Sequence, residues 1–219
     1  LPIEAGGPKF LGFDKDQNPY FAVDVSTVKD PSRIAVIADN AAFEDGRSAA
    51  IDIPPEQSGI LAQARSNLNW HLQHRFCSFC GSESQSHRGG LMRECPTCKT
   101  QHFPRTDPVV IMLVYRGNRC VMGQTLGRQS SGFYSCLAGF MDHGESIEEG
   151  VRREVMEEAG LPIGKVTYPS SQPWPFPSSL MIGCHAEALS ENIEADPGEM
   201  ADVRWFTKDE IKLALENNL

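Results

Sequence analysis

Three glutamates on one face of a predicted helix constrain this chain more than any other feature. Residues 139–161 read GFMDHGESIEEGVRREVMEEAGL, which places Glu154, Glu157 and Glu158 at positions i, i+3 and i+4. Side chains with this spacing share one helix face, where three like charges repel one another. The cluster is explained if hard, oxygen-preferring cations such as Mg²⁺ or Mn²⁺ neutralise it. The alternative is a solvated acidic helix.

The residues around the glutamates predict where this helix begins and ends. Ser146 followed by Glu149 fits a capping box, which starts the helix at the residue after the serine. Gly160 suits the left-handed residue that ends a helix. Arg153 lies four residues before Glu157 and is placed to brace it. An apolar stripe beside the glutamates is formed by Val151, Val155 and Ala159.

The whole run resembles the Nudix box, G-x5-E-x7-R-E-U-x-E-E-x-G-U with U aliphatic, at every specified position. The matching residues are Gly139, Glu145, Arg153, Glu154, Val155, Glu157, Glu158, Gly160 and Leu161. The resemblance implies a Nudix hydrolase, an α/β/α sandwich with a mixed sheet that cleaves a nucleoside diphosphate linked to another group. A pyrophosphate repels nucleophiles by its charge, and divalent ions both neutralise that charge and activate water.

The same resemblance implies roles for individual residues. The implied ligands of a catalytic Mg²⁺ or Mn²⁺ are the carbonyl of Ala138 and the side chains of Glu154, Glu157, Glu158 and Glu199. The implied catalytic residues are Arg153, Glu154, Glu157 and Glu158. Glu157 is expected to orient or deprotonate the attacking water, although Nudix families differ in which glutamate takes that role. On sequence grounds alone Glu199 would be an ordinary surface acid.

Residues 171–179, which read SQPWPFPSS, form a second unusual segment. Three prolines give it a stiff extended backbone, and Trp174 and Phe176 are rigid rings suited to stacking on nucleobases. The alternative is a proline-rich loop packed on the core. The segment resembles the SQPWPFPxS signature that separates NADH pyrophosphatases from other Nudix enzymes. The implied substrate-binding residues are Gln172, Pro173, Trp174, Pro175, Phe176, Pro177, Ser178, Ser179 and, as a further aromatic position with packing as its alternative, Phe103.

Two cysteine pairs predict a zinc ribbon. Cys77-x2-Cys80 and Cys95-x2-Cys98 are separated by 14 residues, and four thiolate ligands leave no open position for water. One structural Zn²⁺ per chain is therefore expected, with two disulfides as the alternative. NADH pyrophosphatases carry such a ribbon at this point of the chain. The remaining cysteines, which are spaced like core residues, are Cys120, Cys136 and Cys184.

The order of these features predicts three domains. A small, mostly β domain that ends in a helix is expected over residues 1–74, the zinc ribbon over 75–103, and the Nudix hydrolase domain over 104–219. The chain opens LPIEAGG without an initiator Met, so we expect a segment of a longer protein. Members of the family continue past the final strand with a helix that contacts the substrate, so the C-terminal end is expected to be incomplete.

Composition narrows the class of partner. The formal charge of −9 argues against broad electrostatic binding to nucleic acid, although the acidic helix supplies part of the deficit. No apolar run approaches the roughly 20 residues of a membrane span, so a cytoplasmic location without membrane contact is expected. A homodimer is expected from the resemblance only.

The predicted activity is metal-dependent hydrolysis of NADH or NAD⁺ to a nicotinamide mononucleotide and AMP. Removal of NAD caps from RNA is left open, because the pocket motif does not separate these substrates. One alternative is a Nudix hydrolase of ADP-ribose or dinucleoside polyphosphates. Another is a non-catalytic module that senses nucleotides, against which the intact Arg153, Glu154, Glu157 and Glu158 argue.

Overall fold

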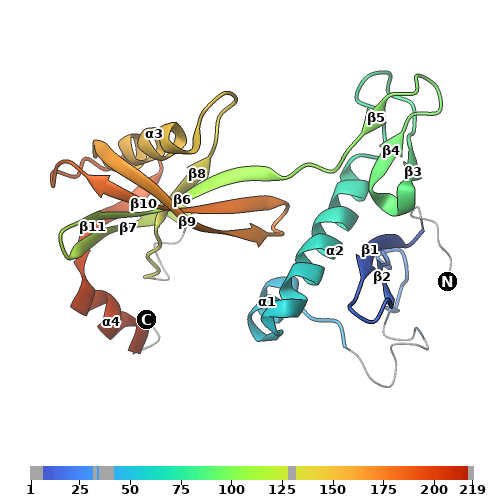
Figure 1. The fold of residues 1–219 in the computed structure, drawn as a ribbon, viewed down its shortest axis with the longest axis horizontal. Helices are drawn as coiled ribbons and strands as arrows, with labels where there is room; N and C mark the ends of the chain where they lie inside the picture. Colours follow the sequence, from blue (N-terminus) through green and yellow to red (C-terminus); the bar gives the residue numbers. More distant parts are fainter. Residues whose placement is uncertain (1–6, 32–33, 35–41, 128–131, 217–219) are drawn as a thin grey trace. The chain divides into compact units, whose positions relative to one another are not determined.

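The computed structural model describes residues 7–31, 34, 42–127 and 132–216, which fall into two compact units (Figure 1). The first unit lies within residues 1–106 and also includes Pro173–Ser178. The second unit comprises residues 107–172 and 179–219. The finer division into three domains stays a prediction.

In the described part of the second unit, six strands form one mixed sheet. The strands are β6 (Asp107–Arg116), β7 (Arg119–Thr125), β8 (Leu137–Phe140), β9 (Ile163–Trp174), β10 (Ser179–Ala188) and β11 (Met200–Thr207). Their order is β11-β7-β6-β10-β9, and β8 also pairs with β6. β10 runs parallel to β6, whereas β7 and β8 run antiparallel to it. The mixed sheet predicted from the resemblance is therefore present.

The core of the second unit lies between this sheet and helix α3 (Ile147–Ala159), which Figure 1 shows against one face. Alternate residues of β6 point into it, because strand side chains alternate between faces. Residues with 0% exposure from both elements are Val110, Met112, Val114, Val151, Val155 and Ala159. The predicted helix ends are confirmed: Ser146 and Glu149 form the capping box, and Gly160 has a φ of 65°.

The last described helix is α4 (Lys208–Glu216), which contacts β11. A cavity of about 520 Å³ lies between α4 and the sheet face opposite α3. Its lining includes Leu113, Tyr115, Cys120, His185 and Ile211. The sheet therefore has a helix on each side, as an α/β/α sandwich requires.

The first unit contains a hairpin, two helices and a small three-stranded sheet. Its elements are β1 (Lys9–Phe13), β2 (Pro19–Ala22), α1 (Gly46–Asp52), α2 (Pro55–Gln73), β3 (Gln85–His87), the 3₁₀ turn η2 (Arg88–Gly90), β4 (Met92–Glu94) and β5 (Gln101–His102). The hairpin comes from Phe10–Phe13 and Tyr20–Val25, the first two of three short apolar stretches whose pattern predicts the mostly β domain. The third predicted stretch, Ile34–Ile37, lies outside the described residues except for Ile34.

Helix α1 is a structural element that the mostly β prediction missed. The Asp45 carboxylate caps it by accepting the backbone N–H groups of Arg47 at 3.0 Å and Ser48 at 3.2 Å. None of its seven residues is buried, so it has no apolar stripe by which a sequence pattern could reveal it. In the described ranges no helix is long and apolar enough to cross a membrane.

Candidate active site and zinc site

Helix α3 presents its three glutamates at different depths. Glu158 is 7% exposed, and the side chains of Glu154 and Glu157 are 12% and 56% exposed. The Oε2 atom of Glu158 is buried and has no hydrogen-bond partner among the described residues. A buried carboxylate oxygen without a partner is costly, and a bound cation would offset that cost.

The buried glutamates repel one another, and Glu199 takes part in that repulsion. Burial raises the pKa of Glu158 to about 7, and the negative charges of Glu154 and Glu199 add to the shift. Burial also raises the pKa of Glu154, again with a contribution from Glu199. The turn before β11 therefore brings Glu199 near two residues of α3 that lie more than 40 positions earlier in the sequence.

Strand β8 supplies backbone to the same region. A backbone hydrogen bond from Ala138 to Glu158 lowers the pKa of that carboxyl group. In an extended strand the N–H and C=O groups of one residue point to the same side, so the Ala138 carbonyl faces the glutamates too. At the next residue, a Cβ on Gly139 would lie 1.9 Å from the Glu154 carboxyl carbon. Only glycine leaves room for the carboxylate.

Arg153 joins the glutamates to the preceding loop. Its guanidinium contacts both carboxylate oxygens of Glu145, at 2.6 and 2.9 Å, and lowers the pKa of that carboxyl group to about 2. The Nη1 atom donates to Glu154 at 2.8 Å and to Glu157 at 2.9 Å, which confirms the predicted brace. The anchoring role of Glu145 had not been predicted. Its only sequence signal is its fixed position in the box.

These residues fit a hard divalent cation by chemistry, because carboxylate and carbonyl oxygens are the ligands that Mg²⁺ and Mn²⁺ prefer. Their oxygens are less tightly gathered than the four sulfurs of the ribbon. In the described part of the chain, only the cysteines bring three or more ligand atoms within 4.8 Å of one another. Glu154 and Glu157 instead each form an ion pair with Arg153.

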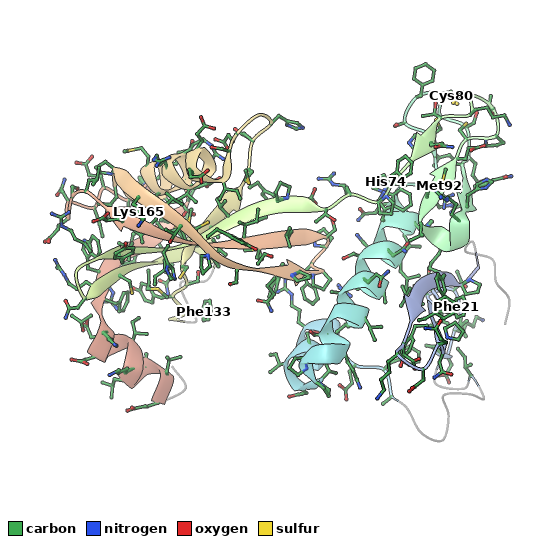
Figure 2. The ribbon with its side chains drawn as sticks, in the orientation of Figure 1. Phe21, His74, Cys80, Met92, Phe133 and Lys165 are labelled. Atoms are coloured by element: carbon green, nitrogen blue, oxygen red, sulfur yellow. The ribbon has the colours of Figure 1, made fainter. Side chains whose placement is uncertain are left out.

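The predicted zinc ribbon is present in the first unit. All four sulfurs lie within 4.8 Å of one another, with Cys77 3.6 Å from Cys98 and Cys80 3.4 Å from Cys95. Sulfurs bound tetrahedrally at about 2.3 Å from Zn²⁺ would lie about 3.8 Å apart, close to this arrangement. A disulfide would need about 2.05 Å, and the four cysteines are free. Figure 2 shows Cys80 at the end of the ribbon remote from His74 and Met92.

Two equivalent turns hold the cysteine pairs. The Cys77 carbonyl accepts the N–H of Gly81 at 2.9 Å, and the Cys95 carbonyl accepts that of Lys99 at 2.9 Å. Gly81 and Lys99, each four residues after the first cysteine of its pair, have a left-handed backbone, with φ of 76° and 64°. Hydrogen bonds with Thr100 lower the pKa of Cys98 to about 6, which favours the thiolate that zinc requires.

The residues of the predicted substrate segment are divided between the units. Pro173–Ser178 cluster with the first unit, and Gln172 and Ser179 belong to the second. Trp174 is 42% exposed, and its ring meets that of Phe176 edge to face at a centroid distance of 5.2 Å. Phe103, just after β5, is 59% exposed, which favours a ring available to a ligand over a packing role.

Comparison with known proteins agrees with this arrangement. Residues 105–218 match the NUDIX domain family, residues 72–103 the NADH pyrophosphatase zinc ribbon domain, and residues 4–70 the NADH pyrophosphatase-like rudimentary NUDIX domain. A crystal structure of a NUDIX hydrolase from Nitrosomonas europaea superposes with a TM-score of 0.52 at 25% identity, covering 62% of this chain and 79% of that one.

Two curated relatives cover more of the sequence. The NAD-capped RNA hydrolase NUDT12 of Macaca fascicularis is 46% identical over 173 residues, which are 74% of this chain and 37% of that protein. The mitochondrial NAD(P)H pyrophosphatase NUDT13 of Mus musculus is 39% identical over 218 residues, 94% of this chain and 61% of that protein. The chain thus spans less than two thirds of either relative. On these matches it belongs to the Nudix family and has the domain set of the NADH pyrophosphatase type.

Proposed function

We propose that this chain hydrolyses the pyrophosphate bond of NADH or NAD⁺ to a nicotinamide mononucleotide and AMP with Mg²⁺ or Mn²⁺. The observation that carries the proposal is the buried, partnerless oxygen of Glu158 beside Glu154 and Glu199. Three carboxylates that repel one another in a partly buried site are stabilised by a cation that binds among them. Zn²⁺ on the four cysteines is proposed as one structural ion per chain.

Each residue has a role that its contacts support. When bound, a divalent cation neutralises phosphate charge and lowers the pKa of a coordinated water. Glu154 and Glu158 hold the cation, with the Ala138 carbonyl and Glu199 as further ligands. Glu157 is the most exposed of the three α3 glutamates, which supports a role in orienting or deprotonating water. Arg153, fixed by Glu145, holds Glu154 and Glu157 in position.

The substrate side of the proposal rests on residues 171–179 and Phe103. The macaque relative's name records hydrolysis of NAD-capped RNA, and the mouse relative's name records NAD(P)H as substrate. Both contain the same NAD-type dinucleotide linkage, and an exposed Trp174 offers a face for one of its bases. NAD caps on RNA are therefore the second proposed substrate.

Product analysis tests this function. The protein is incubated with NADH, NAD⁺, ADP-ribose or NAD-capped RNA under one metal condition, and products are separated by chromatography. We expect AMP and nicotinamide mononucleotide from NADH, and a higher kcat/KM for NADH than for ADP-ribose, because specificity is a difference in transition-state binding. No AMP from NADH, also with a longer form of the protein, would refute the proposal. A preference for ADP-ribose would support the alternative hydrolase.

Trp174→Ala is expected to raise the KM for NADH by about tenfold or more while kcat changes by about twofold or less. Stacking of a base on an aromatic ring contributes about 1–3 kcal/mol, and a contact made equally in ground and transition states acts on KM. Steady-state kinetics measures both constants. Phe79→Ala, at a ring that is 80% exposed on the zinc ribbon, is the matched control. A fall in kcat without a change in KM would contradict the stacking role.

Stabilisation by Mg²⁺ is expected to increase with pH. Because the pKa of Glu158 is raised from 4.5 to about 7, the folded protein binds this proton more tightly than the unfolded chain. The stability it contributes is full below about pH 4.5 and falls as pH rises to about 7, by about 3 kcal/mol in total. Mg²⁺ competes with the proton, so the cation should bind more tightly above about pH 7.

The measurement is the difference in melting temperature with and without millimolar Mg²⁺ at about pH 5.5 and about pH 8. We expect a larger difference at the higher pH in the wild type and a smaller pH dependence in Glu158→Gln, in which Glu154 still binds a proton in competition with the cation. The same difference at both pH values would show that this carboxylate does not hold the cation.

The homodimer is proposed from the resemblance, and the cytoplasmic location is proposed as the default for a chain with no visible targeting signal. Light scattering coupled to size-exclusion chromatography measures the first, and imaging of a tagged full-length protein measures the second. A monomer at micromolar concentration would argue against the dimer.

A further inference from the structure

An arginine outside every recognised motif contacts the substrate segment. Arg65, in the middle of α2, donates its Nε–H to the Pro175 carbonyl at 2.9 Å. The carbon at the centre of its guanidinium lies 4.8 Å from the centroid of the Phe176 ring. The next residue of the helix, Ser66, donates its hydroxyl to the Pro177 carbonyl at 3.3 Å. Two consecutive helix residues therefore hold three consecutive residues of the turn, all within the first unit.

Two residues of α1 lie close to this exposed arginine or to the ring that it contacts. A Cβ on Gly46, at the start of α1, would lie 3.4 Å from Arg65 Nη1, so the two helices pack closely at this point. The guanidinium of Arg47, also on α1, lies 5.0 Å from the same Phe176 ring. Two cations therefore contact Phe176, and the same ring touches Trp174 at its edge. Trp174 is the more exposed of the two rings.

The turn needs such external support because of its composition. Prolines at positions 173, 175 and 177 have no backbone N–H, so half of the residues in Pro173–Ser178 cannot donate a backbone hydrogen bond to stabilise the turn. Its carbonyls remain as acceptors, and Arg65 and Ser66 provide donors for two of them. A charged donor forms the stronger of these bonds.

We propose that Arg65 is a positioning residue for substrate binding, which fixes the Pro175–Pro177 turn and thereby sets the orientation of Trp174. The inference rests on the proposed function, because it takes residues 171–179 as the dinucleotide-binding segment. A turn that is already ordered loses less conformational entropy when ligand binds. Removing the support therefore weakens binding and leaves the chemical step on α3 unchanged.

Kinetics of three variants test this role. Arg65→Met keeps the length of the side chain and removes its charge and donors, and we expect a KM for NADH about tenfold higher with kcat within about twofold. Arg65→Lys keeps the charge but not the planar fork, so its KM should fall between those of the wild type and Arg65→Met. Arg75→Met is the control, because that side chain is 60% exposed, forms an ion pair with Glu83 on the surface and lies over the ring of Phe76 on the zinc ribbon.

A double variant separates positioning from a general structural effect. If Arg65 acts through Trp174, Arg65→Met in the Trp174→Ala background should change KM by less than about twofold, because coupled residues are not additive. If the double variant instead raised KM by the product of the two single effects, the proposal would be overturned. A KM for Arg65→Met equal to that of Arg75→Met would overturn it as well.

The outcome remains decisive if NADH is not cleaved. In that case the proposed activity fails, and the dissociation constant of NAD⁺, measured by calorimetry with zinc retained, replaces KM. If the affinity for NAD⁺ falls from the wild type to Arg65→Lys and again to Arg65→Met, the result would support the positioning role without supporting the activity. No NAD⁺ binding by the wild type would overturn both the activity and this inference. Cleavage of NADH with no effect at Arg65 would overturn only the inference.

Discussion

Replacing Glu157 by Gln is expected to lower kcat for NADH by about two to four orders of magnitude, the usual contribution of general acid–base catalysis. The amide keeps the size of the side chain and its hydrogen-bonding position beside Arg153, but it cannot accept a proton. Because Glu157 is largely exposed and lies outside the core, the melting temperature should stay within a few degrees of the wild type. Stopped time courses with chromatographic detection of AMP measure the rate.

The matched control is Glu148→Gln, an exposed glutamate of the same helix that the box does not specify. It should retain about the full kcat, because Glu148 is an exposed charge about two and a half helical turns before Glu157 and has little effect on the site. If Glu157→Gln retained more than a tenth of the wild-type kcat, the base would have to be another glutamate. Glu154→Gln and Glu158→Gln would then identify it.

Substituting Cys77 by Ser is expected to remove the bound Zn²⁺ and to lower the melting temperature by about 10 °C or more. Zinc binding is coupled to folding of such ribbons and contributes on the order of 10 kcal/mol in small domains. The short strands β3, β4 and β5 form a sheet too small to be stable alone. Mass spectrometry of metal content and a thermal melt measure the two effects.

Cys120→Ser is the control for this second prediction, because Cys120 is half-buried in the other unit and is not among the gathered sulfurs. Its zinc content should equal that of the wild type. A Cys77→Ser protein with one zinc ion per chain and an unchanged melting temperature would contradict the structural role of the metal.

Local sequence signals predicted the parts of the fold that local interactions determine. The ends of α3 were readable because Ser146, Glu149 and Gly160 act within one turn of the helix boundaries. The cysteine spacing predicted the ribbon because each Cys-x2-Cys pair forms its own turn. Both predictions needed no knowledge of distant residues.

Features that depend on tertiary contacts were less visible. From the chain alone, Glu199 is one acid among many, and only the resemblance selected it. The structure shows why it matters electrostatically, since it raises the pKa of two carboxyl groups on α3. Arg65 gave no signal at all, because a single arginine on an exposed helix face has no periodicity or partner in sequence. Helix α1 was missed because its only marker is one capping aspartate.

The close approach of Glu154 to Gly139 affects how natural variants of this site should be judged. A variant with alanine or serine at residue 139 would keep every acid and the arginine of the box, so a count of chemical groups would rate it intact. Its new methyl or hydroxymethyl group would nonetheless overlap the Glu154 carboxylate and turn that side chain away. Activity in such homologues is therefore decided as much by an empty volume as by the charged groups around it.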